Sequence, residues 1–180
     1  MNRPISIIYA TDIHLSDKGP RSRIDNYFES ICSKLEQIDK IAKYRNVHEV
    51  ILGGDVCHSP YESYRVFNCL NNFLKNTHVK WQTLIGQSHD YVGNWESTKE
   101  KTIIHSLSKN GVLELLGPTM RREIDGVKIF ASHQAICPNT FFGSYTSYKD
   151  LNEDCDIVLL SHLHFPFPTE VVNGKTFLAP

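Results

Sequence analysis

The sequence lacks a long apolar run, a paired cysteine motif and a strong excess of charge of either sign. No stretch of its 180 residues approaches the roughly 18 apolar residues of a membrane span, and the N-terminus does not have the basic-then-apolar pattern of a signal peptide. We therefore expect a cytoplasmic protein. The five cysteines are scattered, with no Cys-x-x-Cys spacing, which argues against a disulfide framework and a structural zinc site. With a net charge of -1, any contact with nucleic acid must come from a local patch.

Strand-like and helix-like segments alternate along the first two thirds of the chain, which predicts a parallel sheet covered by helices. Apolar runs predict strands near residues 4–10, 50–54, 80–85, 112–116 and 156–160. Helical periodicity predicts helices near residues 24–46, 62–76 and 97–110, the first with Ile24 on its apolar face and the last with a capping box at Ser97. Hairpins are predicted at Asp125-Gly126, between residues 119–124 and 127–132, and at Asn173-Gly174. We expect an α/β fold in a single domain, residues 1–180.

Side chains that bind metals follow the predicted strands, where ligands of open α/β sheets collect. Asp12 and His14 are two residues apart in an extended segment, so both can reach one ion. Gly53 and Gly54 leave room for a bound ion beside the carboxylate of Asp55. The polar residues that follow the strands are Asp12, His14, Asp55, Ser88, His89, Asp90, His133, His162 and His164.

Taken singly, each of these residues has an ordinary structural explanation, as a turn carboxylate or a capping histidine. Five strand ends of this kind together favour a site. Mixed imidazole and carboxylate ligands suit first-row divalent ions, and the absence of thiolates at the strand ends favours manganese or iron over structural zinc. Two such ions about 3.5–4 Å apart clamp a phosphoryl group. We therefore predict a two-ion centre in which Asp55 is the bridging carboxylate.

In chain order, the motifs are Asp-x-His, Gly-Asp, Gly-x-x-His-Asp, a lone His and His-x-His. This series resembles the calcineurin-like metallophosphoesterase superfamily over nearly the whole chain. The segment Asp12-Ile13-His14-Leu15, with the basic loop and long helix that follow it, is most similar to SbcD-like DNA repair nucleases. The resemblance implies a metallophosphoesterase-type β-sandwich core flanked by helices, with ligands on loops at the strand ends.

The resemblance also implies a role for each residue. A first ion would be held by Asp12, His14, Asp55 and His164, and a second by Asp55, His133, His162 and the residue at position 88. His89 would be the acid or electrostatic stabiliser beside the leaving oxygen, a role commonly worth about 10² to 10⁴ in rate. Asp90 would orient the ring of His89.

The chain departs from the family pattern at the second ion. The family motif is Gly-Asn-His-Asp or Gly-Asn-His-Glu, whereas this chain reads Gly86-Gln87-Ser88-His89-Asp90, which places Ser88 at the asparagine position. A hydroxyl is a poorer ligand than an amide carbonyl. Either water or Gln87 supplies the missing oxygen, or Ser88 itself ligates, or the change lowers activity. Asn94, in Gly93-Asn94-Trp95-Glu96, is a fourth candidate further from the strand.

Two smaller departures concern the end of the chain. Ser161 stands where the family usually has glycine, which is harmless if the backbone there is not left-handed. SbcD-like nucleases continue into further strands, a DNA-contacting cap and a segment that binds an ATPase. We therefore expect either a domain that lacks these C-terminal strands and the cap, or a sheet completed in another way.

The leading hypothesis is a two-metal phosphodiesterase of DNA nuclease type, acting in DNA repair or recombination as an exonuclease or endonuclease. A metal-bound hydroxide would attack the DNA phosphodiester. The expected cofactors are two divalent ions, Mn²⁺ first, with Mg²⁺, Fe²⁺ and Zn²⁺ as alternatives. The expected partners are DNA, an SbcC-like ATPase subunit and a second copy of the chain. The alternatives are the same chemistry on a small or protein phosphoester, and a catalytically weakened metal-binding module.

A basic loop follows the first strand and is the expected DNA contact. Lys18, Arg21 and Arg23 would hold the DNA backbone, and Tyr61 or Tyr91 would stack on a base. Cys57 and His58 are expected to shape the pocket rather than to bind a metal.

Overall fold

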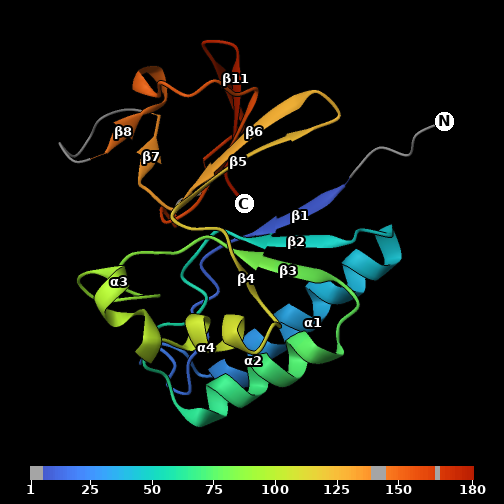
Figure 1. The fold of residues 1–180 in the computed structure, drawn as a ribbon, viewed down its shortest axis with the longest axis vertical. Helices are drawn as coiled ribbons and strands as arrows, with labels where there is room; N and C mark the ends of the chain where they lie inside the picture. The colour runs from blue at the N-terminus through green and yellow to red at the C-terminus, as the bar shows by residue number, and fades with distance from the viewer. Residues whose placement is uncertain (1–5, 139–144, 165–166) are drawn as a thin grey trace.

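The described residues form two packed β-sheets, a layer of helices and a small two-stranded sheet (Figure 1). The computed structural model describes residues 6–138, 145–164 and 167–180; residues 4–5 of the first predicted strand lie outside the described residues. This architecture confirms the predicted sandwich core flanked by helices. None of the helices in the described part of the chain is long and apolar enough to cross a membrane.

The first sheet is parallel throughout and has the order β1-β2-β3-β4. Its strands are β1 (Ile7–Ala10), β2 (Glu49–Leu52), β3 (Lys80–Thr83) and β4 (Glu114–Leu115). The predicted strands near these positions are confirmed, although β3 and β4 are shorter than expected. Because neighbouring strands are parallel, the loops that follow β1, β2 and β3 leave the sheet at the same edge.

Long helices cover one face of this sheet (Figure 1). α1 (Tyr27–Arg45) begins at Asn26, whose side chain accepts a hydrogen bond from the backbone of Glu29. α2 (Tyr64–Asn76) is capped in the same way by Ser63. α1 buries Phe28, Ile31, Leu35 and Ala42. Ile24 precedes the helix and is fully exposed, so its assignment to the apolar face was wrong.

The segment after β3 contains three short helical pieces rather than one helix. They are α3 (Trp95–Thr98), the 3₁₀ turn η1 (Lys99–Lys101) and α4 (Ile103–Lys109). The predicted capping box at Ser97 is wrong, because Thr102 has extended backbone angles and its hydroxyl accepts the N–H of His105. Ile104 and Leu107 of α4 are buried as the periodicity predicts.

The second sheet has the order β10-β11-β9-β6-β5. β5 (Thr119–Ile124) and β6 (Val127–Ser132) form the predicted hairpin, with positive φ at both Asp125 and Gly126. β9 (Ile157–Leu160) lies between β6 and β11 (Lys175–Leu178), and β10 (Glu170–Val172) pairs with β11 across Asn173 and Gly174. β7 (Ile136–Cys137) and β8 (Thr146–Ser147) form a separate pair that precedes the 3₁₀ turn η2 (Tyr148–Asp150).

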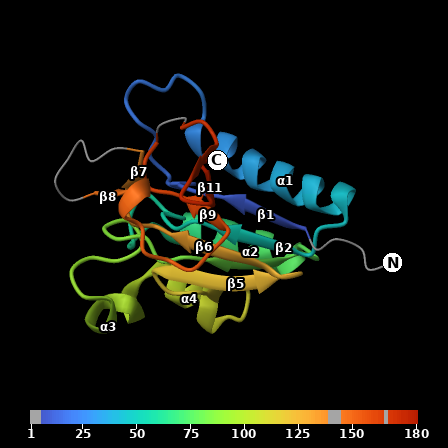
Figure 2. The same cartoon turned by 90° about the horizontal axis from the view of Figure 1, so that it is seen from above.

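Three apolar clusters hold the layers together. One lies between the first sheet and the helices. A second joins the two sheets, where Ile51 of β2 packs with Ile129 of β6 and Leu159 of β9. The third covers the outer face of the second sheet, with Tyr148 stacked on Phe177 at 4.0 Å. Both views place α3, β7 and β8 at the end of the molecule towards which β1 and β2 point (Figures 1 and 2).

Candidate metal centre

The loops that follow β1 and β2 are bound to each other by backbone hydrogen bonds. The N–H of Gly53 donates to Ala10 (2.7 Å), and the N–H of His14 donates to Asp55 (2.9 Å). These bonds place the Asp-x-His segment directly beside the Gly-Asp segment. Further along the chain, the N–H of His162 donates to Asp12 Oδ2 (3.1 Å), which brings the end of β9 to the same place.

Several candidate site residues have strained backbones. Positive φ values occur at Asp12 (54°), His14 (50°), Asp55 (51°), Ser88 (77°) and His162 (71°). Such conformations cost non-glycine residues about 1–3 kcal/mol each and cluster at functional sites, where the surrounding structure maintains them. Ser161 does not have positive φ, so serine can replace the family's glycine at this position without backbone strain.

The predicted ligands converge in two groups. The first contains Asp12, His14 and His164, with His164 Nε2 3.2 Å and His14 Nε2 3.9 Å from Asp12 Oδ1. In the second, which contains Asp55, His133 and His162, His133 Nε2 lies 3.2 Å from Asp55 Oδ1 and 3.3 Å from His162 Nδ1.

Asp55 faces both groups. Its Oδ1 points to His133, and its Oδ2 lies 3.8 Å from His14 Nε2. The side chain is 2% exposed. One carboxylate therefore presents an oxygen to each group, and the division of the ligands between two ions stays a prediction.

Hydrogen bonds and glycines fix the orientation of these side chains. His133 Nδ1 donates to the carbonyl oxygen of Gly53 (2.7 Å), so the lone pair of a neutral ring lies on Nε2, which faces Asp55. A Cβ on Gly54, whose φ is +100°, would lie 2.5 Å from His133 Nδ1. A Cβ on Gly86 would lie 2.0 Å from Asp55 Oδ1. Glycine at both positions is therefore required by the close approach of the ligands.

The donor atoms present fit divalent cations. Asp55 Oδ1 and both ring nitrogens of His14 are buried with no hydrogen-bond partner among the described residues. Each such atom costs about 1–3 kcal/mol unless something satisfies it. Burial lowers the pKa of His14 to about 4 despite the nearby Asp55, so this ring is neutral and able to bind a metal at pH 7.

The two histidines of the second ligand group, buried His133 and exposed His162, have pKa shifts of opposite sign. Burial lowers the pKa of His133, but Asp55, the Gly53 carbonyl and Asp12 together raise it by more, and the net shift is upward. Burial, and then the neighbouring His133, lower the pKa of His162.

Asp90 does not orient His89, which corrects the role implied by the family resemblance. Asp90 Oδ2 accepts the N–H groups of Asp55 (2.9 Å) and Gly86 (2.7 Å), and Oδ1 accepts that of Val56 (3.2 Å). His89 Nδ1 instead bonds to the carbonyl oxygen of His58 (2.6 Å). Asp90 is 1% exposed and faces inward from the loop, away from the ring that precedes it. It therefore joins the loop after β3 to the backbone of the Asp55 loop.

Gln87, and not Ser88, lines a cavity with the second ligand group. His133, His162 and Gln87 border a cavity of about 460 Å³. Ser88 is exposed, and its left-handed backbone donates an N–H to the carbonyl oxygen of Tyr91. Asn94 lies just before α3, where its carbonyl accepts the hydroxyls of Ser97 and Thr98.

The basic loop is only partly directed towards the site. Lys18 lines a groove of about 690 Å³ that includes His58 and Tyr61. Arg23 instead makes a bidentate pair with Asp25. Arg21 is exposed and does not line this groove. Tyr91 makes a T-shaped contact with Trp95, 5.7 Å away between ring centroids, and lines the cavity of Gln87 and His133 rather than the groove of Lys18.

His58 was predicted only to shape the pocket, but its ring lies beside two of the candidate site histidines. Its ring centroid lies 5.8 Å from that of His14 and 5.4 Å from that of His89. Its position three residues after Asp55, in the same loop, was the available signal.

Comparisons with known proteins support the fold. No family model and no curated protein matches the sequence. Among solved structures, an archaeal phosphodiesterase superposes with a TM-score of 0.55 at 17% sequence identity, covering 97% of this chain and 82% of that one. At this identity the likeness establishes a shared α/β fold.

Proposed function

We propose that this protein is a metal-dependent phosphodiesterase of DNA nuclease type with two divalent ions. The observation that carries the proposal is Asp55, which presents one carboxylate oxygen to the group of Asp12, His14 and His164 and the other to the group of His133 and His162. The phosphodiesterase with the same fold adds support at the level of the reaction class. When bound, two such ions polarise phosphoryl oxygens and activate water at neutral pH.

The protein's own residues would orient the phosphoester and transfer one proton to the departing oxygen. His133 is locked by Gly53, and Asp12 by the N–H of His162, so these side chains do not need to reorganise when a substrate binds. His89 keeps Nδ1–H on the His58 carbonyl, which leaves Nε2 to carry a proton to the departing oxygen when the ring is cationic.

For the second ion we propose Gln87 as the oxygen ligand in place of asparagine. This chain has two residues between Gly86 and His89, where the family motif has one. Ser88 has a left-handed backbone, and the side chain of Gln87 lines the cavity of His133 and His162. We expect Gln87→Ala to weaken binding of the second Mn²⁺ by about 10-fold or more, and Ser88→Ala, its matched control, to leave it unchanged. Equal affinities in both variants, measured by equilibrium dialysis, would reject this assignment.

DNA is the proposed substrate because the groove beside His58 offers a cation at Lys18 and an aromatic ring at Tyr61, which is 51% exposed. The second candidate is a small or protein phosphoester. One observation favours it: Arg23 is engaged with Asp25 and Arg21 does not line the groove, so that Lys18 is the one cation of the predicted DNA-binding loop that lines it.

The test compares hydrolysis of bis-p-nitrophenyl phosphate, p-nitrophenyl phosphate and labelled DNA, with Mn²⁺ and with excess chelator. We expect Mn²⁺-dependent cleavage of the diester and of DNA, reduced about 10²- to 10⁴-fold in kcat by His89→Asn. His78→Ala, which changes an exposed histidine between α2 and β3, is the control. Absence of all hydrolysis at full Mn²⁺ occupancy would refute the enzyme, and cleavage of the small esters alone would refute the nuclease.

A further inference from the structure

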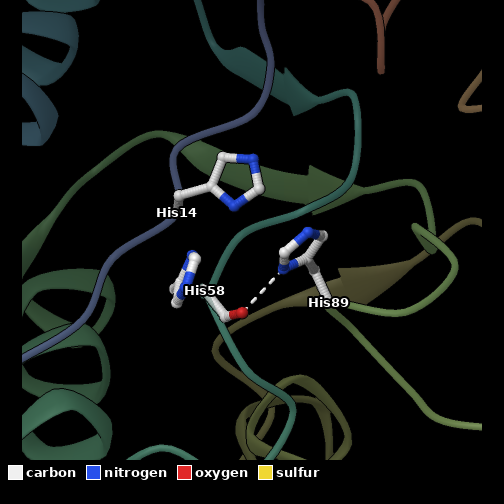
Figure 3. Close-up of side chains that lie close together, drawn as sticks. All are labelled: His14, His58 and His89. Carbon is white, nitrogen blue, oxygen red and sulfur yellow. Dashed lines mark hydrogen bonds between the residues drawn. The ribbon is translucent and has the colours of Figure 1, made fainter. Parts of the chain in front are cut away.

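A third group of potential metal ligands lies beside the two that include carboxylates. His14 follows β1, His58 follows β2 and His89 follows β3, and their rings face one another (Figure 3). One nitrogen from each ring lies within 4.8 Å of the other two. The ring centroids of His14 and His89 are 4.5 Å apart. Unlike the other two groups, this one consists of imidazoles alone.

The ring of His89 is arranged as metal-binding histidines usually are. A carbonyl oxygen can only accept a hydrogen bond, so the 2.6 Å contact with His58 requires a proton on His89 Nδ1. The lone pair of the neutral ring is then on Nε2. A histidine that binds a metal commonly donates its other N–H to a backbone carbonyl in this way. His133 and Gly53 show the same arrangement in the second ligand group.

The ring of His14 has two nitrogens to satisfy, and both are buried without a partner among the described residues. Its Nε2 faces Asp12 and Asp55 at 3.9 and 3.8 Å. Its other nitrogen points to the side on which His58 and His89 lie (Figure 3). The ring thus stands between the first ligand group and the three-histidine group.

We propose that His14, His58 and His89 form a third cation site, which takes imidazole-preferring ions such as Zn²⁺. Ions that favour oxygen ligands, Mg²⁺ and Mn²⁺, are disfavoured there because the group offers no carboxylate. Zinc binds imidazole nitrogen at about 2.0–2.1 Å, so the rings must adjust until each places one nitrogen at that distance from the ion. The exposed side chain of His58 is free to make that movement.

An ion at this site would inhibit the proposed reaction, a consequence that rests on the proposed function. A neutral imidazole has one lone pair, so His14 can serve the three-histidine group or the group of Asp12, but not both. Coordination of His89 Nε2 also removes the atom that would carry a proton to the leaving oxygen. Zinc would therefore prevent His14 from binding the ion beside Asp12 and His89 from donating its proton.

The first test locates zinc directly, by anomalous diffraction at the zinc edge from crystals grown with Zn²⁺. Wild type and His78→Ala should show a peak among the three rings. His58→Ala and His58→Gln should lose that peak while keeping those beside Asp55. Two variants are used, each checked by thermal melting, so that a folding defect in one does not decide the result. No peak in wild type, or an undiminished peak in both His58 variants, would overturn the site.

The second test measures inhibition, as the ratio of diesterase rates with and without micromolar Zn²⁺ in the Mn²⁺-loaded enzyme. The zinc concentration for half inhibition should rise at least about 10-fold in His58→Ala, since losing even an outer-shell partner costs metal sites 10- to 100-fold in affinity. It should not change in His78→Ala. A zinc peak without any diesterase activity would keep the site and reject the proposed function, whereas activity without the peak would do the reverse.

Discussion

Replacing Asp90 by asparagine should destabilise the whole fold rather than impair catalysis alone. Asp90 is buried and accepts three backbone N–H groups, two on Oδ2 and one on Oδ1. Asparagine has one acceptor oxygen, so its NH₂ group must face at least one backbone donor. If its oxygen takes the place of Oδ2, the bonds to Asp55 and Gly86 remain but weaken, and the N–H of Val56 loses its partner.

The size of the effect follows from these bonds. A hydrogen bond to an ionised carboxylate contributes about 1.5–3 kcal/mol, and a buried donor without a partner costs about 1–3 kcal/mol. Burial raises the pKa of Asp90 to about 7, so the first figure applies above that pH. One bond lost and two weakened give about 2–4 kcal/mol of lost stability in Asp90→Asn. For a protein of this length, this corresponds to a fall in Tm of about 4–16 °C.

Urea denaturation followed by circular dichroism measures this loss. Asp154→Asn is the matched control, because its carboxylate forms an exposed pair with Lys128 that solvent screens. An unfolding free energy of Asp90→Asn within about 0.5 kcal/mol of wild type, together with a large loss of kcat, would contradict the structural role of Asp90. It would also restore the orienting role that the family resemblance implies.

Three other predictions test the site and the core. Gly86→Ala, whose Cβ would lie 2.0 Å from Asp55 Oδ1, should bind fewer than two Mn²⁺ per chain in equilibrium dialysis, and two would contradict the steric argument. His133 has a raised pKa, so Mn²⁺ binding at pH 6.5 should release up to about one proton and strengthen as pH rises; calorimetry in two buffers would detect this release, and His133→Gln should lack it. Phe177→Ala removes a fully buried ring stacked on Tyr148, so unfolding should become easier by about 3–5 kcal/mol in urea, and a change below about 1 kcal/mol would be inconsistent with this packing.

The sequence predicts the position of the candidate site because parallel strands deliver their loops to one edge. Asp12, Asp55 and His133 each follow an apolar run, and the structure brings the three together. Hairpins were also predictable, since Asp-Gly and Asn-Gly specify the required positive φ within two residues. In both cases the deciding information is local in the chain.

The errors concern contacts that depend on how distant segments meet. Asp90 bonds to the backbone of a loop 34 or 35 residues away, which no spacing in its own motif reveals. At the second ligand group the sequence left Gln87 and Ser88 both open, and the structure has Gln87 lining the cavity while Ser88 has a left-handed backbone outside it; which residue ligates stays a prediction. Arg23 pairs with Asp25 nearby, so a count of basic residues overestimates the free positive charge.

Anomalous scattering from crystals soaked with Mn²⁺ would show directly whether Asp55 bridges two ions. We expect two peaks about 3.5–4 Å apart on either side of Asp55, one beside Asp12, His14 and His164 and the other beside His133 and His162. A single peak, or peaks that do not share the Asp55 carboxylate, would contradict it.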